Sequence, residues 1–305
     1  MNVLSIQSHV VFGRVGNRSA VFPLERMGIN VWPLNTVQYS SHTGKPGWTG
    51  TAFGADHLLD IIDGLNKLGC LSSCDAVLSG YIGDMETGMA ILEAVRIVKS
   101  KNPKALYCCD PVMGDHPGGL YVQKDIPAFF QQRALAMADV VIPNRFEAQM
   151  LSGLQLSDRN SALKAVQAIV ERGPSIVLMT SYPYATDGGV GFLLADHGEY
   201  SELSTPVLPF SQPVKGSGDL LSALFLGNLL ISSRACRRAG EHPNEPDCSD
   251  NPVTGVAQAA LGAAASSLYS VLEASVACGS GELALLEAQD FIAQAPKRFS
   301  PISLM

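Results

Sequence analysis

The most restrictive feature of the sequence is an alternation of short apolar runs with longer segments of helical spacing. Runs that are apolar throughout are typical of strands buried on both faces, and they predict strands at residues 3–7, 30–34, 75–79, 105–110, 139–142, 176–180 and 191–195. Helical spacing fills intervals between them, at residues 20–27, 55–68, 87–101, 126–137 and 161–172. This order predicts an α/β fold with a doubly wound, mostly parallel central sheet flanked by helices, in a single domain spanning residues 1–305.

Composition limits the classes of function. Apolar residues form 47% of the chain and charged residues 16%, which is enough apolar material for a large buried core. The net charge is −7 and no basic run occurs, so a nucleic-acid partner is not expected, because phosphate binding needs clustered positive charge. The seven cysteines include no CxxC pair, and Cys70 and Cys74 lack a second ligand pair nearby. Reduced thiols are therefore expected, rather than a zinc site or disulfides.

Two segments need separate interpretation. Residues 251–272 carry no charge and are long enough to span a membrane, but they are rich in Ala, Gly and Ser, which favours a close-packed core helix. Residues 234–252 carry charge and three prolines, which predicts an exposed, mobile insertion between two helices. No signal-peptide pattern precedes the first predicted strand. We therefore expect a cytoplasmic protein with no membrane partner.

Polar residues gather where the predicted strands end. In an open parallel sheet, ligands bind at the carboxyl ends of the strands. Six consecutive strand ends carry polar groups, at residues 8–9, 38–44, 80–81, 110–115, 143–144 and 180–181. A ligand site is expected along this edge of the sheet.

The sharpest local motif is Lys215-Gly216-Ser217-Gly218-Asp219, which precedes an apolar run at residues 220–231. Glycines let backbone N–H groups converge, and a helix N-terminus adds partial positive charge, so the motif predicts an anion hole suited to a transferring phosphoryl group. Asp219 in the first helical turn is a candidate base for an attacking hydroxyl. The motif alone is equally compatible with Asp219 as a helix-capping carboxylate beside a glycine turn.

Three carboxylates, Asp110, Asp115 and Glu147, are expected near this anion hole. Together they indicate a magnesium ion held partly through water and phosphate oxygens, although each alone is compatible with a turn or capping role. The spacing of His9, His42 and His116 fits no familiar metal-ligand set. Neither a GxGxxG fingerprint nor a GxxxxGK[ST] loop occurs, so two common nucleotide-binding architectures lack their signatures.

The chain resembles the pyridoxal kinases of the ribokinase superfamily from Leu4 to about Leu272. Three segments carry the closer resemblance: Ser5 to Val10 with Val15-Gly16-Asn17, then Asn35 to Gly44, then Leu78 to Tyr81. Three others resemble the wider superfamily: Cys109 to Asp115, Pro143 to Ala148, and Gly216 to Asp219. The resemblance implies a ribokinase-like fold that transfers a phosphoryl group from ATP, as Mg·ATP, to the 5′-hydroxyl of pyridoxal. In this family a homodimer is usual and a monovalent cation such as K⁺ often assists.

The resemblance also implies a role for each matching residue. Asp219 matches the general base, and the N–H groups from Gly216 through Ser217 and Gly218 match the anion hole. Substrate contacts are matched by Ser8, Val15, Thr43 and Tyr81. Contacts to ATP and its magnesium are matched by Asp110, Asp115, Tyr121 (on a flap over the site), Asn144, Glu147, Thr180 and Ser181, with Asp115 and Glu147 as the metal ligands.

One departure from the family leaves the substrate open. Many relatives have a Tyr after the His-Thr-Gly segment, where this chain has Lys45-Pro46, so the choice among pyridoxal, pyridoxamine and pyridoxine is not predicted. A hydroxymethylpyrimidine kinase of thiamine synthesis is an alternative, although many of those carry Cys at the position of Asp219. A sugar kinase is disfavoured by the apolar and aromatic Val15 and Tyr81, and a non-catalytic binding protein by the intact base and anion hole.

Overall fold

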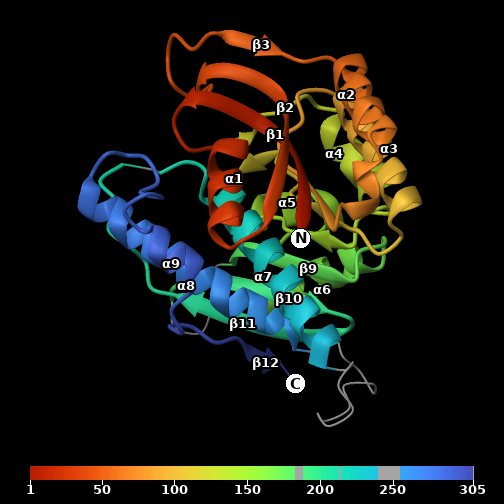
Figure 1. Cartoon of the computed structure of the whole chain (residues 1–305). Coiled ribbons are helices and arrows are strands. Elements are labelled where there is room, and N and C mark those ends of the chain that lie inside the picture. The colour runs from red at the N-terminus through yellow and green to blue at the C-terminus, as the bar shows by residue number, and fades with distance from the viewer. Residues whose placement is uncertain (183–187, 213, 240–254, 305) are drawn as a thin grey trace.

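The computed structural model describes residues 1–182, 188–212, 214–239 and 255–304 (Figure 1). Its centre is a ten-stranded sheet in the order β12-β11-β10-β9-β8-β5-β4-β1-β2-β3. The strands are β1 (Asn2–Phe12), β2 (Asn30–Ser41), β3 (Gly50–Ala52), β4 (Ala76–Ser79), β5 (Leu106–Cys109), β8 (Val140–Val141), β9 (Ile176–Tyr182), β10 (Val190–Asp196), β11 (Glu199–Thr205) and β12 (Ile302–Leu304). A separate short hairpin consists of β6 (Gly114–Asp115) and β7 (Gly119–Leu120).

The middle of the sheet is parallel and its two edges are antiparallel. Strands from β2 through β1, β4, β5 and β8 to β9 pair in parallel. At one edge β10, β11 and β12 add antiparallel strands, and at the other β3 pairs antiparallel with β2. The prediction of a mostly parallel central sheet flanked by helices is therefore confirmed.

Helices cover both faces of the sheet (Figure 1). One face is packed by α2 (Ala55–Lys67), α3 (Met85–Lys101), α4 (Ile126–Phe129), α5 (Arg145–Ser152) and α6 (Arg159–Val170). The other face is packed by α1 (Asn17–Arg26), α7 (Ser217–Ala239), α8 (Val256–Cys278) and α9 (Gln289–Ala293). Two shorter turns, a 3-10 helix at Cys70–Ser73 and a π-helical turn at Phe130–Ala134, complete the described helical segments.

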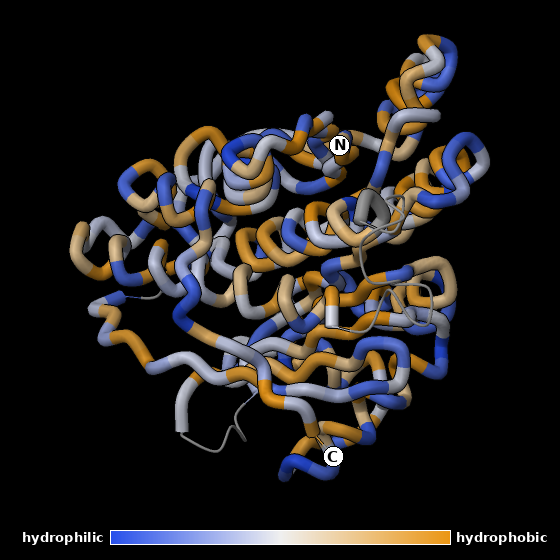
Figure 2. The backbone as a smooth tube through the Cα atoms, turned by 60° about the horizontal axis from the view of Figure 1, so that its bottom comes forward, coloured by the Kyte–Doolittle hydropathy of each residue, from blue (hydrophilic) through white to orange (hydrophobic). Residues whose placement is uncertain are grey.

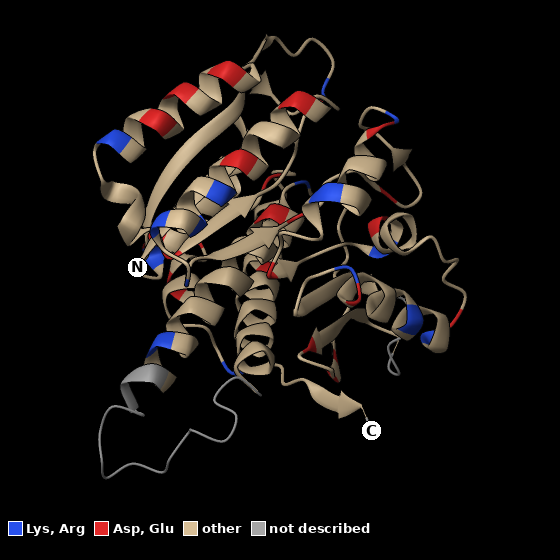
Figure 3. Cartoon of the chain, turned by 90° about the vertical axis from the view of Figure 1, so that its right-hand side faces the viewer, with Lys and Arg blue, Asp and Glu red and all other residues tan. Residues whose placement is uncertain are grey.

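Two hydrophobic cores result, one on each face of the sheet. Successive strand residues point to opposite faces, so Leu4 and Ile6 of β1 enter the core under α2 and α3, while Val3 enters the core under α1 and α7. Apolar and polar residues alternate along the covering helices (Figure 2). Asp and Glu lie along the outer helices with Lys and Arg interspersed (Figure 3). Strands buried on both sides explain the continuously apolar runs in the sequence.

Several predicted boundaries are wrong, and the reasons are tertiary. The first two strands continue past their apolar segments, because β1 and β2 pair again from His9 opposite Gln38 to Phe12 opposite Ser41 after a register shift. Ser8, His9 and residues 38–41 therefore lie within strands, not after them. The predicted helix at 126–137 is divided into α4 and the π-helical turn. The strand predicted at 191–195 is present in β10 but runs antiparallel to β9.

The segment predicted to be a mobile insertion is partly helical. Arg234 and the residues up to Ala239 form the end of α7, and residues 240–252 lie outside the described part of the chain. The predicted core helix at 251–272 corresponds to α8, which contacts α7 and buries Leu261, Leu268 and Val271. By length and composition alone, α7 and α8 are each apolar enough to cross a membrane. Because core helices of soluble proteins pass the same test, this is weak evidence for a membrane span.

Candidate active site

The N-terminus of α7 forms the centre of the candidate site. Gly216 has a φ of +87°, and a Cβ built there would lie 1.7 Å from the carbonyl oxygen of Arg14, so only glycine fits this approach. The Ser19 hydroxyl donates a hydrogen bond of 2.9 Å to the Gly216 carbonyl oxygen. These contacts attach the glycine turn to the loop between β1 and α1, and they leave the turn's N–H groups at the start of a helix, where anions are favoured.

Asp219 lies in the first turn of α7 and faces the same loop. Its Oδ2 accepts a hydrogen bond of 2.9 Å from the backbone N–H of Gly16. Gly16 itself packs directly on β1, since a Cβ there would lie 2.1 Å from the carbonyl oxygen of Ser8. Burial raises the pKa of Asp219 to about 6, and the Gly16 hydrogen bond partly opposes that rise. A carboxylate with a pKa near neutrality is suited to accept a proton from a substrate hydroxyl.

Asp110 lies next to Asp219, at the end of β5. Its side chain is buried, and its Oδ2 accepts a hydrogen bond of 2.7 Å from Ser222, one turn after Asp219 on α7. Burial and the neighbouring charge of Asp219 raise the pKa of Asp110 to about 8, while the Ser222 bond acts in the opposite direction. Two carboxylates in one poorly solvated site repel each other, which favours a bound cation between or beside them.

Glu147 is a second carboxylate that, like Asp110, is buried. Its Oε1 accepts the N–H of Met113 at 3.0 Å and its Oε2 accepts the N–H of Asn144 at 2.8 Å. The Asn144 side chain in turn accepts the Glu147 N–H at 3.0 Å, which completes a capping box at the start of α5. Burial and the charge of Asp110 raise the pKa of Glu147 well above its usual range. Glu147 thus joins the ends of two strands and adds charge to the site.

The small hairpin of β6 and β7 borders the acidic residues. The Asn144 amide donates a hydrogen bond of 2.7 Å to the carbonyl oxygen of Gly114. Asp115 on β6 forms an ion pair of 3.4 Å with Lys215, which precedes the glycine turn. Tyr121 follows β7 and is 53% exposed. Its backbone N–H donates a hydrogen bond of 3.0 Å to the carbonyl oxygen of Met113, the residue whose own N–H binds Glu147.

The remaining predicted residues lie on strands and loops around this centre. Thr180 on β9 forms a parallel bridge with Asn144 and donates its N–H to Pro143 at 2.8 Å. Ser181 has a φ of +54°, a strained backbone conformation for a residue other than glycine. The structure therefore brings Asn144, Thr180 and Glu147 together.

The proposed substrate residues are less tightly grouped. Val15 and Ser8 flank Gly16. The Tyr81 carbonyl oxygen accepts a 3.5 Å hydrogen bond from Thr36, and the pKa of the Tyr81 phenol is raised by burial and by Tyr39. Thr43 is exposed in the loop between β2 and β3.

The carboxylates near the glycine turn are of the kind that binds magnesium. Mg²⁺ in phosphoryl-transfer sites is held by one or two carboxylates together with waters and phosphate oxygens. Asp110, Asp115 and Glu147 supply carboxylates beside the glycine turn, and the first and third are held apart from bulk water with raised pKa values. Among the described residues no group of three or more His, Cys, Asp or Glu side chains is close enough to hold a metal alone. A cation here would therefore need further oxygen ligands, such as waters or the oxygens of a bound phosphate.

Comparison with known proteins gives the family. The pyridoxal kinase PdxY of Rubrobacter xylanophilus is 41% identical over 302 residues, which cover 98% of this chain and 96% of that protein. The pyridoxal kinase PdxY of Granulibacter bethesdensis is 42% identical over 299 residues, with 96% of each chain covered. The chain belongs to the pyridoxal kinase family.

Solved structures and a match to a protein-family model agree with this assignment. The pyridoxal kinase of Leishmania donovani in complex with ADP and ginkgotoxin superimposes with a TM-score of 0.85 at 28% identity, covering 100% of this chain and 99% of that one. The same enzyme in complex with ADP and pyridoxamine gives a TM-score of 0.82 at 28% identity, with the same coverage. Residues 71–239 also match the family described as phosphomethylpyrimidine kinase. The predicted ribokinase-like relationship to pyridoxal kinases is therefore confirmed.

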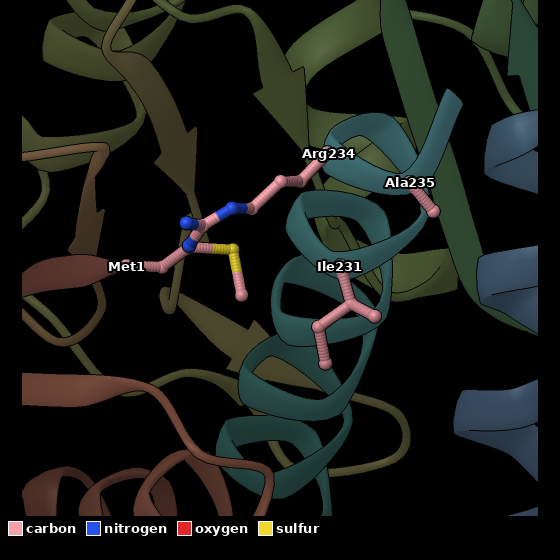
Figure 4. Close-up of a pocket in the computed structure, with 4 residues that line it drawn as sticks. All are labelled: Met1, Ile231, Arg234 and Ala235. Atoms are coloured by element: carbon pink, nitrogen blue, oxygen red, sulfur yellow. The ribbon is translucent and has the colours of Figure 1, made fainter. Parts of the chain in front are cut away.

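One hollow of the structure lies away from the glycine turn. A cavity of about 340 Å³ is lined by Met1, Ile231, Arg234 and Ala235 (Figure 4). Ile231 is twelve residues after Asp219 on α7, which corresponds to about 18 Å along the helix. A second hollow of about 170 Å³ includes Val214, two residues before Gly216, and the end of α8. Of these two hollows, the second lies at the glycine-turn end of α7.

Sequence reasoning missed three residues that support the site. Gly16 was part of a recognised segment, but its hydrogen bond to Asp219 joins residues 203 positions apart. Ser222 lies three residues after Asp219, so helical spacing offered a signal that it shares the same face. Glu282 accepts the N–H of Arg14 at 3.1 Å across 268 positions, and no local pattern indicates that contact.

Proposed function

We propose that this chain is an ATP-dependent pyridoxal kinase, which transfers the γ-phosphoryl group of ATP to the 5′-hydroxyl of pyridoxal in vitamin B6 salvage. The observation that carries the proposal is Asp219, a carboxylate with a pKa of about 6 at the start of α7, next to the glycine turn. A base and an anion site side by side are what in-line transfer to an alcohol requires. The names of the relatives support pyridoxal as the alcohol.

In the proposed mechanism Asp219 takes the proton of the attacking hydroxyl. The Gly16 N–H holds Asp219 in place, and burial makes the carboxylate basic enough to act near neutral pH. The N–H groups of Gly216, Ser217 and Gly218 receive the negative charge of the transferred group. Ser8, Val15, Thr43 and Tyr81 contact the pyridine ring, and Tyr121 closes over the site to exclude water.

The residues proposed to contact ATP are Asp110, Asn144, Glu147, Thr180 and Ser181. Asp115 and Glu147 are the proposed magnesium ligands, with Asp110 beside them. A bound Mg²⁺ neutralises charge on the phosphate oxygens during transfer. Burial and mutual repulsion raise the pKa values of Asp110 and Glu147, which favours protonated carboxyls when no cation is bound. We further propose that a monovalent cation such as K⁺ assists.

The whole molecule is proposed to act as one catalytic domain, as a cytoplasmic homodimer. Its partners are the small-molecule substrates. Pyridoxamine and pyridoxine are proposed as additional alcohols, since the Leishmania donovani enzyme has been solved with each of them and ADP.

An ADP-release assay tests the function. Purified protein is incubated with Mg·ATP and, in separate reactions, pyridoxal, pyridoxamine, pyridoxine and hydroxymethylpyrimidine. Turnover that is highest with a B6 vitamer supports the proposal. Turnover only with hydroxymethylpyrimidine overturns the substrate while keeping the chemistry. Absence of turnover with all four alcohols contradicts the proposal and favours a binding protein.

The second candidate is a hydroxymethylpyrimidine kinase. It is favoured by the match of residues 71–239 to the family described as phosphomethylpyrimidine kinase. That match includes the glycine turn and Asp219 but not the β1, β2 and β3 segments that carry Ser8, Val15 and Thr43. The substrate-side segments therefore decide between the two candidates, and the relatives that cover them are pyridoxal kinases.

A further inference from the structure

Glu282 connects three segments on the substrate side of the site. Its Oε1 lies 2.6 Å from the Nζ of Lys45, which belongs to the loop between β2 and β3. Its Oε2 accepts the backbone N–H of Arg14 at 3.1 Å, in the loop between β1 and α1. Glu282 itself follows α8, so one carboxylate binds two loops that lie 237 and 268 positions away in the sequence.

Lys45 has a second anchor. Its ammonium group lies 4.5 Å from the ring centroid of Phe12, at the end of β1, in cation–π geometry. The side chain of Lys45 is 45% exposed and that of Glu282 is 25% exposed, so the pair is partly shielded from water. An isolated surface ion pair contributes little to stability, but a carboxylate that also holds a backbone N–H loses less side-chain freedom for each bond it makes.

The loop held by Glu282 is the one that contacts the catalytic turn. Arg14 places its carbonyl oxygen against Gly216, and Gly16, two residues later, donates its N–H to Asp219. The loop held by Lys45 contains Thr43, a proposed ring contact. Nearby, burial and the charges of Lys215 and Lys45 lower the pKa of His42, so this loop lies close to the start of α7. Glu282 therefore binds both of the loops that carry proposed contacts to the ring, the loop of Arg14 and the loop of Lys45.

We propose that Lys45 and Glu282 form a latch that holds the loop at residues 42–49 against the loop at residues 13–16 and so fixes the alcohol-substrate side of the site. The proposal rests on the proposed kinase function and assigns both residues as positioning residues, with no contact to the reacting atoms. The latch lies on the vitamer side, so it acts on binding of the ring substrate and leaves ATP binding unaffected.

Four variants test the latch. Lys45→Met keeps an apolar stem over Phe12 and removes the charge, Glu282→Gln keeps the shape and can still accept the Arg14 N–H, and K45M/E282Q combines the two changes. Lys67→Met is the matched control, because it breaks the Lys67–Asp63 ion pair on the exposed face of α2. For each, kcat and the KM values for pyridoxal and ATP are measured at low and high salt.

We expect Lys45→Met and Glu282→Gln each to raise the KM for pyridoxal by about two- to fivefold, which corresponds to loss of one partly shielded ion pair. The KM for ATP should stay within about twofold, and the double variant K45M/E282Q should lose no more than the worse single variant, because both changes remove the same ion pair. High salt should raise the KM for pyridoxal in the unmodified protein and have little effect in Lys45→Met. Lys67→Met should behave like the unmodified protein.

Three results would overturn the latch. An effect of Lys45→Met without one of Glu282→Gln means that Lys45 contacts the substrate directly. Additive losses in the double variant mean that the two side chains act independently of each other. An equal rise in the KM for ATP means that the variants disturb the whole site.

A measurement without turnover separates the latch from the kinase proposal. Trp48, in the same loop, is 40% exposed, so chymotrypsin cleavage after it reports on opening of the loop. Glu282→Gln should be cleaved several times faster than Lys67→Met, whether or not the protein phosphorylates pyridoxal. Equal cleavage rates contradict the latch, whereas a fast-cleaved variant of a protein inactive on pyridoxal contradicts only the proposed function.

Discussion

Replacing Asp219 by Asn should reduce activity and increase stability at the same time. Asn has nearly the same shape, and its Oδ1 can still accept the hydrogen bond that Gly16 donates to Oδ2 of Asp219. It cannot accept a proton from the substrate. Loss of a general base typically lowers the rate by about 10²- to 10⁴-fold, and we expect kcat to fall within that range.

The gain in stability follows from the cost of burying the charge. The pKa of Asp219 is raised from 3.8 to about 6 by burial, a difference that corresponds to about 3 kcal/mol against the ionised folded form. Because the side chain is partly open to solvent, we expect about 1–2 kcal/mol. Below about pH 4 the carboxyl is protonated in both the folded and the unfolded chain, so the penalty is absent. It grows as the pH rises toward 6 and is complete above that value.

The assay combines single-turnover kinetics with urea unfolding of both proteins at pH 4.5 and pH 8. Asp219→Asn should be more stable than the unmodified protein at pH 8, and the difference should shrink at pH 4.5. Turnover within tenfold of the unmodified protein would show that Asp219 is not the base. Lower stability of the variant at pH 8 would refute the argument that the ionised carboxylate is penalised by its surroundings.

Three further predictions concern the same site. Gly216→Ala should lose at least about 1–2 kcal/mol of stability in urea unfolding, because φ is +87° and the added Cβ would meet the Arg14 carbonyl oxygen. Gly218→Ala is the control, since a Cβ there would have nothing within 4 Å, and equal losses in the two variants would contradict the prediction. Glu147→Gln should lose about 1–3 kcal/mol in the same measurement, because its amide nitrogen cannot accept one of the two N–H groups now bound, and unchanged stability would argue against both bonds. The kcat/KM for pyridoxal should rise as the pH passes through about 6, when Asp219 ionises, and a profile flat from pH 5 to 8 would rule out that titration.

The local parts of the fold could be predicted from the sequence. The apolar strand runs and the glycine turn before Asp219 follow from period, burial and helix-terminus chemistry, and the structure has each of them. Helix α5 was missed although Asn144 and Glu147 have the three-residue spacing of a capping box, because its eight residues are too few for a clear helical period. The extensions of β1 and β2 mix polar residues such as Ser8 and Gln38 with apolar ones such as Val10 and Phe12, and a register shift interrupts their pairing, so no regular pattern marks them as strands.

The contacts that join distant segments could not be predicted in this way. Neither Lys45 nor Glu282 has a local pattern that names its partner, and the bond between them depends on how the loop after β2 meets the segment after α8. The raised pKa values of Asp110 and Glu147 likewise depend on burial and mutual proximity, which arise only when β5 and β8 pair. Sequence motifs gave the residue types of the site, and the packing of the sheet determines their electrostatics.

The long sequence separations in the site have a consequence for synthesis of the protein on the ribosome. The Gly16–Asp219 bond requires about two thirds of the chain, and the Arg14–Glu282 bond requires almost all of it. A nascent chain can form β1, β4 and β5 early, but it cannot complete the catalytic turn until α7 has left the exit tunnel. Chains that end before α7 therefore lack the carboxylate of Asp219 and cannot hydrolyse ATP through the proposed site.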